Sequence, residues 1–132
     1  MLTIKLPVAP SVNAAFFNRK GGKGYGRIKS AKYRAWLKDA DAHYMLQKKD
    51  VVPIRGPYIC GMIFPRKLKG DLDNRVKLIL DWLVSRELTS DDRYLMSYHP
   101  VRGDTPDGYV IVQAAERPDA GSFLSSTATH AE

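Results

Sequence analysis

The segment Tyr58–Phe64 constrains the fold of this chain more than any other, because its seven consecutive residues are nearly all apolar. Side chains of a strand alternate between two faces, so a strand is apolar throughout only where both faces are covered. We therefore predict a central strand here. Cys60, the only cysteine in the chain, has no partner for a disulfide and is interpreted as a small buried apolar residue.

Alternating apolar residues predict three further strands, and helical periodicity after a capping residue predicts two helices. The predicted strands are Leu2–Val8, Arg93–Val101 and Gly108–Ala115, the last two joined as a β-hairpin. The predicted helices begin at the N-caps Ser30 and Asp73 and end near Lys49 and Arg86. This order predicts an α+β (mixed α/β) fold, with two helices packed on a small mixed sheet.

The length of 132 residues fits a single domain with one modest core. After Glu116 the composition changes to small polar residues, so we predict a folded domain over residues 1–116 and a disordered tail over 117–132. No segment is apolar enough to span a bilayer, and the segment Met1–Lys5 lacks the apolar region of a signal peptide. A cytoplasmic protein is therefore expected.

The chain carries a net charge of +7 and has a pI near 9.6, which points to a polyanionic partner. Nucleic acid is the first candidate and an acidic membrane surface the second, while a merely solvated basic surface stays open. The glycine-rich loop over residues 18–27 lacks the ending of a P-loop, so no nucleotide cofactor is expected. The candidate DNA contacts are Arg19, Lys20, Lys23, Arg27, Lys29, Lys32, Arg66, Lys67 and Lys69.

Acidic residues gather at one place in this basic chain. Six of the 14 Asp and Glu residues lie between Asp71 and Asp92, whereas residues 51–70 contain none. Crowded carboxylates repel one another unless a cation offsets their charge. Two short connections at the same edge of the sheet are expected to bring the groups around Asp71 and Asp92 together. Oxygen ligands favour Mg²⁺, and three scattered histidines with one cysteine argue against zinc.

Each of these acidic residues taken alone has a simpler interpretation. A single Asp before a helix is usually a cap, and Asp81 is interpreted as an i,i+4 partner of Lys77. The joint pattern is harder to explain in that way, because Lys77 lies one helical turn after Asp73, on the same side of the expected helix.

The whole pattern resembles the RusA-type Holliday junction resolvases, a family often found in phages and prophages. The strongest part of the resemblance is Asp71-Leu72-Asp73-Asn74 followed by Lys77, Asp81 and the Asp91-Asp92 pair. Weaker parts are the segment Leu6–Asn13 and the helix start with Ser30, Tyr33 and Arg34. The resemblance covers most of residues 3–115.

The resemblance implies a homodimeric, Mg²⁺-dependent endonuclease, with Mn²⁺ as a substitute, that makes paired symmetric nicks in four-way DNA junctions. It implies a role in DNA recombination and repair within a bacterial host cell, as a nucleoid-associated activity. The implied catalytic residues are Asp71, Asp73, Lys77 and Asp92. The implied metal ligands are Asp71, Asp73, Asp92 and, with weaker support, Asp91. Two symmetric nicks also require two active sites, which a two-fold dimer supplies.

Two other functions are compatible with the sequence. One is a non-catalytic basic DNA-binding protein, in which the carboxylates serve only as helix cap and surface charge. The other is a nuclease for other branched DNA such as flaps, since the same site would serve it.

Overall fold

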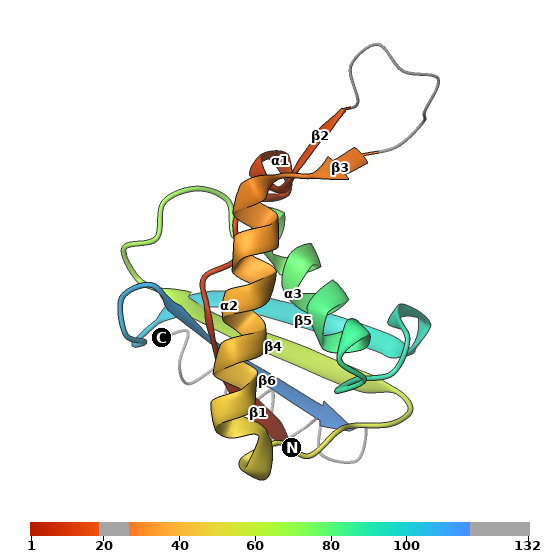
Figure 1. Cartoon of the computed structure of the whole chain (residues 1–132). Helices are drawn as coiled ribbons and strands as arrows, with labels where there is room; N and C mark the ends of the chain where they lie inside the picture. The colour runs from red at the N-terminus through yellow and green to blue at the C-terminus, as the bar shows by residue number, and fades with distance from the viewer. Residues whose placement is uncertain (19–26, 117–132) are drawn as a thin grey trace.

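The computed structural model of the chain describes residues 1–18 and 27–116, and it places two long helices on one face of a four-stranded sheet (Figure 1). This confirms the predicted α+β domain. The candidate DNA contacts Arg19, Lys20 and Lys23 and the predicted tail over residues 117–132 lie outside the described residues, as does the side chain of Arg27.

The sheet has the strand order β1-β6-β4-β5, and a separate two-stranded ribbon pairs β2 with β3. The strands are β1 (Leu2–Pro7), β2 (Phe16–Asn18), β3 (Arg27–Lys29), β4 (Tyr58–Pro65), β5 (Leu95–Gly103) and β6 (Tyr109–Glu116). The α-helices are α1 (Val12–Ala15), α2 (Ala31–Gln47) and α3 (Asp73–Ser85), and two 3₁₀ turns are η1 (Lys48–Asp50) and η2 (Asp92–Tyr94).

Strand β4 is buried along its whole length, which confirms the prediction of a central strand. Its neighbours are β6 on one side and β5 on the other. Cys60 is fully buried in it, and burial raises the pKa of this thiol to about 12. A thiol that stays protonated in this way is a packing group rather than a nucleophile.

The predicted hairpin of the last two strands is wrong. Strand β5 pairs in parallel with β4, whereas β6 lies between β1 and β4 and is antiparallel to both. Periodicity identifies a strand but not its partner, and here burial decides the partner. The core-facing residues Val110, Val112 and Ala114 of β6 are fully buried, while Met96 of β5 is 54% exposed. The more apolar strand therefore takes the inner position, and β5 forms the edge.

The parallel pairing of β4 with β5 also separates the two acidic segments. Pro65 lies beside Gly103, so the turn to Asp71 leaves the sheet where β4 ends. Tyr58 lies beside Leu95, so Asp92 lies where β5 begins. The expectation that both acidic segments meet at one edge is therefore wrong. They lie at opposite ends of this strand pair, and α3 runs between them (Figure 1).

Helices α2 and α3 are joined through the indole of Trp82, which is 1% exposed. Its Nε1–H donates to Asp41 Oδ1 of α2 at 2.9 Å, and Arg86 Nη2 donates to Asp41 Oδ2 at 2.6 Å. The ring of Tyr44 meets the Trp82 ring edge-on, with centroids 5.8 Å apart. One carboxylate thus accepts bonds from Trp82 of α3 and from the C-cap residue Arg86, and fixes how the helices lie on the sheet.

The beginning of α2 confirms Ser30 as an N-cap. Ser30 Oγ accepts from Tyr33 N–H at 3.1 Å and donates to Ala14 O at 2.7 Å. Ser11 caps the short α1 in the same way, by accepting from Ala14 N–H at 3.2 Å. The two serines therefore fix where α1 and α2 begin.

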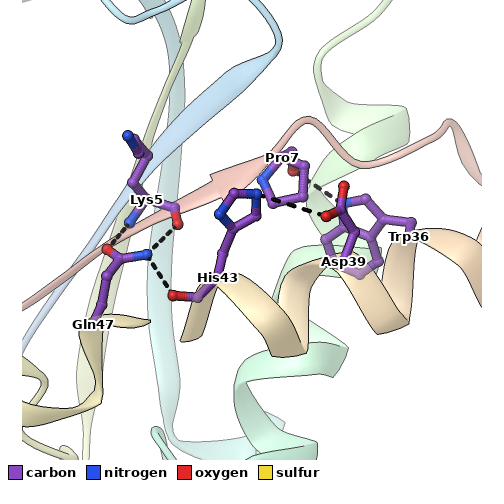
Figure 2. A network of polar contacts seen from close by, with 6 residues as sticks. All are labelled: Lys5, Pro7, Trp36, Asp39, His43 and Gln47. Carbon is purple, nitrogen blue, oxygen red and sulfur yellow. Dashed lines mark hydrogen bonds and ion pairs between the residues drawn. The ribbon is translucent and has the colours of Figure 1, made fainter. Parts of the chain in front are cut away.

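Gln47, the last residue of α2, protects the outer edge of β1 (Figure 2). Its Oε1 accepts from Lys5 N–H at 2.8 Å, and its Nε2 donates to Lys5 O at 2.7 Å and to His43 O at 2.9 Å. The amide thereby satisfies the backbone of an edge strand as a neighbouring strand would. Nearby, Lys5 Nζ lies 4.9 Å from the centre of the Tyr109 ring.

We expect Gln47→Leu to lower the free energy of unfolding by about 1–2 kcal/mol, because the backbone groups of Lys5 lose their partner. Urea denaturation measures the change. Lys38→Leu, at an exposed position of the same helix, is the matched control for added surface hydrophobicity. Equal urea midpoints for the two variants would show that the hydrogen bonds between Gln47 and Lys5 do not contribute to stability.

Candidate functional site

A pocket of about 270 Å³ opens where α3, η2 and β5 meet. It brings together three residues that the sequence predicts as catalytic, two from the first half of α3 and one from η2. Its lining residues are Asp73, Val76, Lys77, Leu80, Asp81, Asp92, Leu95 and Tyr98. Asp71 and Asp91 do not line it.

The helical repeat of α3 positions the polar side of this pocket. Asp73, Lys77 and Asp81 are spaced four residues apart and therefore share one face of the helix. Lys77 Nζ lies 3.4 Å from Asp81 Oδ2, as the i,i+4 interpretation predicted. Both side chains are more than a third exposed, so solvent screens the pair and it contributes little to stability. Its effect is to hold the Lys77 ammonium over the pocket.

Asp71 has the capping role that the sequence assigned to Asp73. Its Oδ1 accepts from Asp73 N–H at 3.0 Å, while the N-cap position is Leu72, which makes no side-chain cap bond. Asp73 is therefore the first residue of α3 and not its cap, which corrects the prediction. With Asp71 bonded to the backbone, the Asp73 carboxylate is left to line the pocket.

The neighbouring residues Asp91 and Asp92 line different pockets. Asp91 Oδ1 accepts from Arg93 N–H at 3.3 Å and so caps η2. Asp91 also lines a separate pocket of about 320 Å³, together with Arg55 and Glu87. Asp92 lines the pocket along α3. The geometry therefore separates a capping carboxylate from one that lines the same pocket as Lys77.

The carboxylates of this region do not form a ready metal site. In the part of the chain that the structure describes, no three His, Cys, Asp or Glu side chains lie close enough to hold one ion. The donors along the pocket are all oxygens, which suits Mg²⁺, an ion that usually takes one or two carboxylates and keeps several waters. The donor chemistry thus fits the ion, and the individual ligands remain a prediction.

Two arginines hold the turn that precedes Asp71. Arg102 of β5 donates from Nε to Leu68 O at 3.2 Å and from Nη2 to Gly70 O at 2.7 Å. Arg75 of α3 donates from Nη2 to Lys69 O at 3.5 Å. Three successive carbonyls thus accept bonds from guanidinium groups. Sequence reasoning missed this role, because charge counting does not show that these guanidinium groups bond the protein's own backbone.

A similar arrangement holds the segment before Asp92. Ser90 Oγ accepts from Gly56 N–H at 2.8 Å, and Arg55 Nη1 donates to Glu87 O at 2.8 Å. The segment that leads into β4 therefore fixes the connection between α3 and η2. Both acidic segments are held by backbone hydrogen bonds, which orients their side chains before any ligand binds.

We expect Arg102→Lys to quicken amide hydrogen exchange for residues 68–73 and to leave it unchanged in β6, because a single ammonium cannot bond two carbonyls as the guanidinium fork does. The overall charge is kept, so any change reflects the lost hydrogen bonds. Lys67→Arg, on the same turn, is the control. Unchanged exchange in Arg102→Lys would show that the fork does not hold the turn.

The candidate DNA contacts that the structure describes are on the surface. Lys29, Lys32, Lys67 and Lys69 are exposed. Arg66 is also exposed, but its Nε lies 2.9 Å from Asp104 Oδ1, and this contact raises the pKa of the guanidinium. Part of the positive charge of Arg66 is therefore neutralised, which makes it the weakest candidate of this group.

In a comparison with known protein families, the family model described as Endodeoxyribonuclease RusA matches residues 6–113. The matched range includes the pocket along α3 and both segments that carry its carboxylates. No curated protein matches the chain in sequence.

Proposed function

The chain belongs to the RusA endodeoxyribonuclease family, whose activity is directed at Holliday junctions, and on this premise we propose that it resolves four-way DNA junctions by paired, Mg²⁺-dependent nicks. The observation that carries the proposal is the pocket that Asp73, Lys77 and Asp92 line together. A pocket lined by three carboxylates and one ammonium suits a phosphodiester held beside a divalent cation.

The residues that would hold Mg²⁺ are Asp73 and Asp92, with Asp71 next to Asp73. When bound, the ion would lower the pKa of a bound water and offset the charge of the phosphate. Asp73 and Asp92 line the same pocket, and this assignment is compatible with one or two ions. Water and phosphate oxygens would supply the remaining ligands.

The chain's own cations perform the other steps in this proposal. Exposed lysines on α2 and on the turn before Asp71 bind the DNA backbone and position the junction. Lys77 stabilises the charge that develops on the phosphate when water attacks phosphorus and the 3′ oxygen leaves. Asp81 keeps the ammonium of Lys77 in place through their 3.4 Å contact.

We expect Lys77→Gln to lower the single-turnover rate of junction cleavage by about 10²–10³-fold, as removal of one transition-state donor does elsewhere. Junction affinity should fall less than threefold, because many other cations contact the backbone. Gel-shift and rapid-quench measurements separate the two effects. Lys49→Gln, on η1, removes an equal charge outside both the pocket and the proposed DNA contacts, and should keep the wild-type rate. Equal rates for both variants would remove Lys77 from the mechanism.

The proposal is tested with a labelled synthetic four-way junction in Mg²⁺, in Mn²⁺ and in EDTA, beside flap and linear duplexes. Symmetric nicks that require the metal and occur only in the four-way junction would support resolution. Cleavage of flaps at an equal rate would favour a broader branched-DNA nuclease.

A non-catalytic DNA-binding protein is the second candidate, because the described residues hold no three-ligand metal cluster. Tight junction binding without cleavage in either metal would favour it.

Paired nicking also requires two active sites, so we propose that the protein is a homodimer. Light scattering measures the molar mass in solution and tests this.

No helix in the described part of the chain is long and apolar enough to cross a membrane.

A further inference from the structure

A second groove, of about 370 Å³, lies next to the catalytic pocket along α3. It is bounded by α2, by α3 and by the base of the β2–β3 ribbon, which lies beside the start of α2 in Figure 1. Its lining residues are Phe16, Lys29, Tyr33, Leu37, Asp81, Trp82, Ser85 and Arg86. Asp81 lines both the groove and the catalytic pocket, so the two are neighbours on the surface.

The groove combines a partly open apolar wall with a cationic rim. The Tyr33 and Trp82 rings are 5% and 1% exposed and form its packed floor, whereas the half-buried Phe16 and Leu37 supply its open apolar surface. The Phe16 ring meets the Tyr33 ring edge-on with centroids 5.2 Å apart. Lys29 Nζ lies 5.7 Å from the centre of the Tyr33 ring, and Arg86 is exposed at the C-terminal end of α3. Nucleotides need this combination, because the base is flat and apolar while the phosphates on either side are anionic.

We propose that this groove is a nucleobase-binding site, which takes the base of a nucleotide next to the cleaved phosphate. The inference rests on the proposed function, because it requires a phosphodiester in the pocket along α3. A DNA strand held in that pocket would reach the groove by passing Asp81, which lines both recesses. Turning a base out of a duplex costs a few kcal/mol of unstacking and unpairing, which contacts in the groove would offset.

Two kinds of ligand could fill an apolar recess: a nucleobase with its flanking phosphates, or an apolar side chain of a peptide. The distribution of charge around the groove favours the nucleobase. Lys29 lines the groove, and Lys32 is exposed in the first turn of α2. Arg86 also lines the groove, but its Nη2 donates to Asp41 Oδ2 at 2.6 Å, so its charge is partly offset. The two lysines would attract DNA phosphates beside a bound base. Asp81 is the acidic group in the groove lining, and Lys77 already pairs with it.

The test combines changes in the DNA with changes in the groove. Four-way junctions carry a single abasic site, or a single 2-aminopurine, at each nucleotide flanking the nick in turn. Dissociation constants are measured in EDTA by fluorescence anisotropy for the wild-type protein, Ser85→Phe and Ser85→Ala. Ser85 is exposed at the groove, so the phenyl ring fills the recess without entering the core, and Ser85→Ala is the matched control.

On the intact junction we expect Ser85→Phe to weaken binding about tenfold, as loss of one base–aromatic contact does, and Ser85→Ala to weaken it less than twofold. An abasic site at one flanking position should weaken wild-type binding by the same factor. On that abasic junction, Ser85→Phe should cause no further loss. The fluorescence of 2-aminopurine at the same position should change on binding to the wild-type protein and not on binding to Ser85→Phe.

Equal wild-type affinity for every abasic junction would overturn the inference without need of a variant. Additive losses from Ser85→Phe and the abasic site would also overturn it. These outcomes are distinct from failure of the proposed function. A protein that shows the expected affinity pattern but never cuts in Mg²⁺ would keep the base site and lose the nuclease. Paired cutting in Mg²⁺, together with additive losses of affinity from Ser85→Phe and the abasic site, would keep the nuclease and overturn the base site.

Discussion

Asp92→Asn is expected to lower the rate of junction cleavage by at least about 10³-fold, whereas Asp91→Asn should retain most of the activity. The two residues are adjacent in sequence, but only Asp92 lines the pocket with Asp73 and Lys77. The change to Asn keeps the shape of the side chain and removes the charge that would attract Mg²⁺. The Asp91 side chain caps η2. Asn caps a helix nearly as well as Asp, so Asp91→Asn should leave η2 in place.

Junction binding by Asp92→Asn should stay within threefold of the wild-type value or become tighter, because a negative charge beside the phosphate has been removed. Asp73→Asn should behave in the same way. Single-turnover cleavage and gel shifts with the same labelled junction measure both quantities. A loss of cleavage in Asp91→Asn equal to that in Asp92→Asn would show that the two pockets do not distinguish the pair. Wild-type cleavage by Asp73→Asn would remove that residue from the site.

Trp82→Ala is expected to lower the free energy of unfolding by about 3–5 kcal/mol, which is a large part of the 5–15 kcal/mol typical of a whole domain. The change empties the contact between α2 and α3 and leaves Asp41 without the indole N–H that donates to it. Because α3 carries Asp73 and Lys77, the loss also loosens the pocket. Urea denaturation followed by far-UV circular dichroism measures the change.

Two controls separate volume from hydrogen bonding at this position. Trp82→Phe keeps most of the apolar volume and should cost about 1–2 kcal/mol for the lost bond to Asp41. Met96→Ala removes a large apolar side chain that is 54% exposed on β5, and should change stability by less than about 0.5 kcal/mol. A Trp82→Ala protein that unfolds at the wild-type urea concentration would contradict the role given to this indole.

The sequence alone determined the features that depend on local pattern. Period-two and helical repeats located the long elements, because side-chain burial follows directly from those repeats. The continuous apolar run of β4 predicted its inner position, and Ser30 predicted the start of α2. The spacing of Asp73, Lys77 and Asp81 placed them on one helix face, since α3 keeps a regular repeat through all three.

Only the tertiary structure decided how distant segments meet. The sequence did not show that β6 would separate β1 from β4, so the hairpin and the shared edge for Asp71 and Asp92 were wrong. Asp71 and Asp91 accept from backbone N–H groups, whereas Asp73 and Asp92 line the pocket. Which carboxylate takes which role depends on the residue at which each helical turn begins, and the sequence does not locate that residue closely enough. The arginine bonds to the turn before Asp71 and the groove beside Asp81 are likewise invisible in the sequence. They join residues far apart in the chain, and only the packing of α2, α3 and β5 brings those residues together.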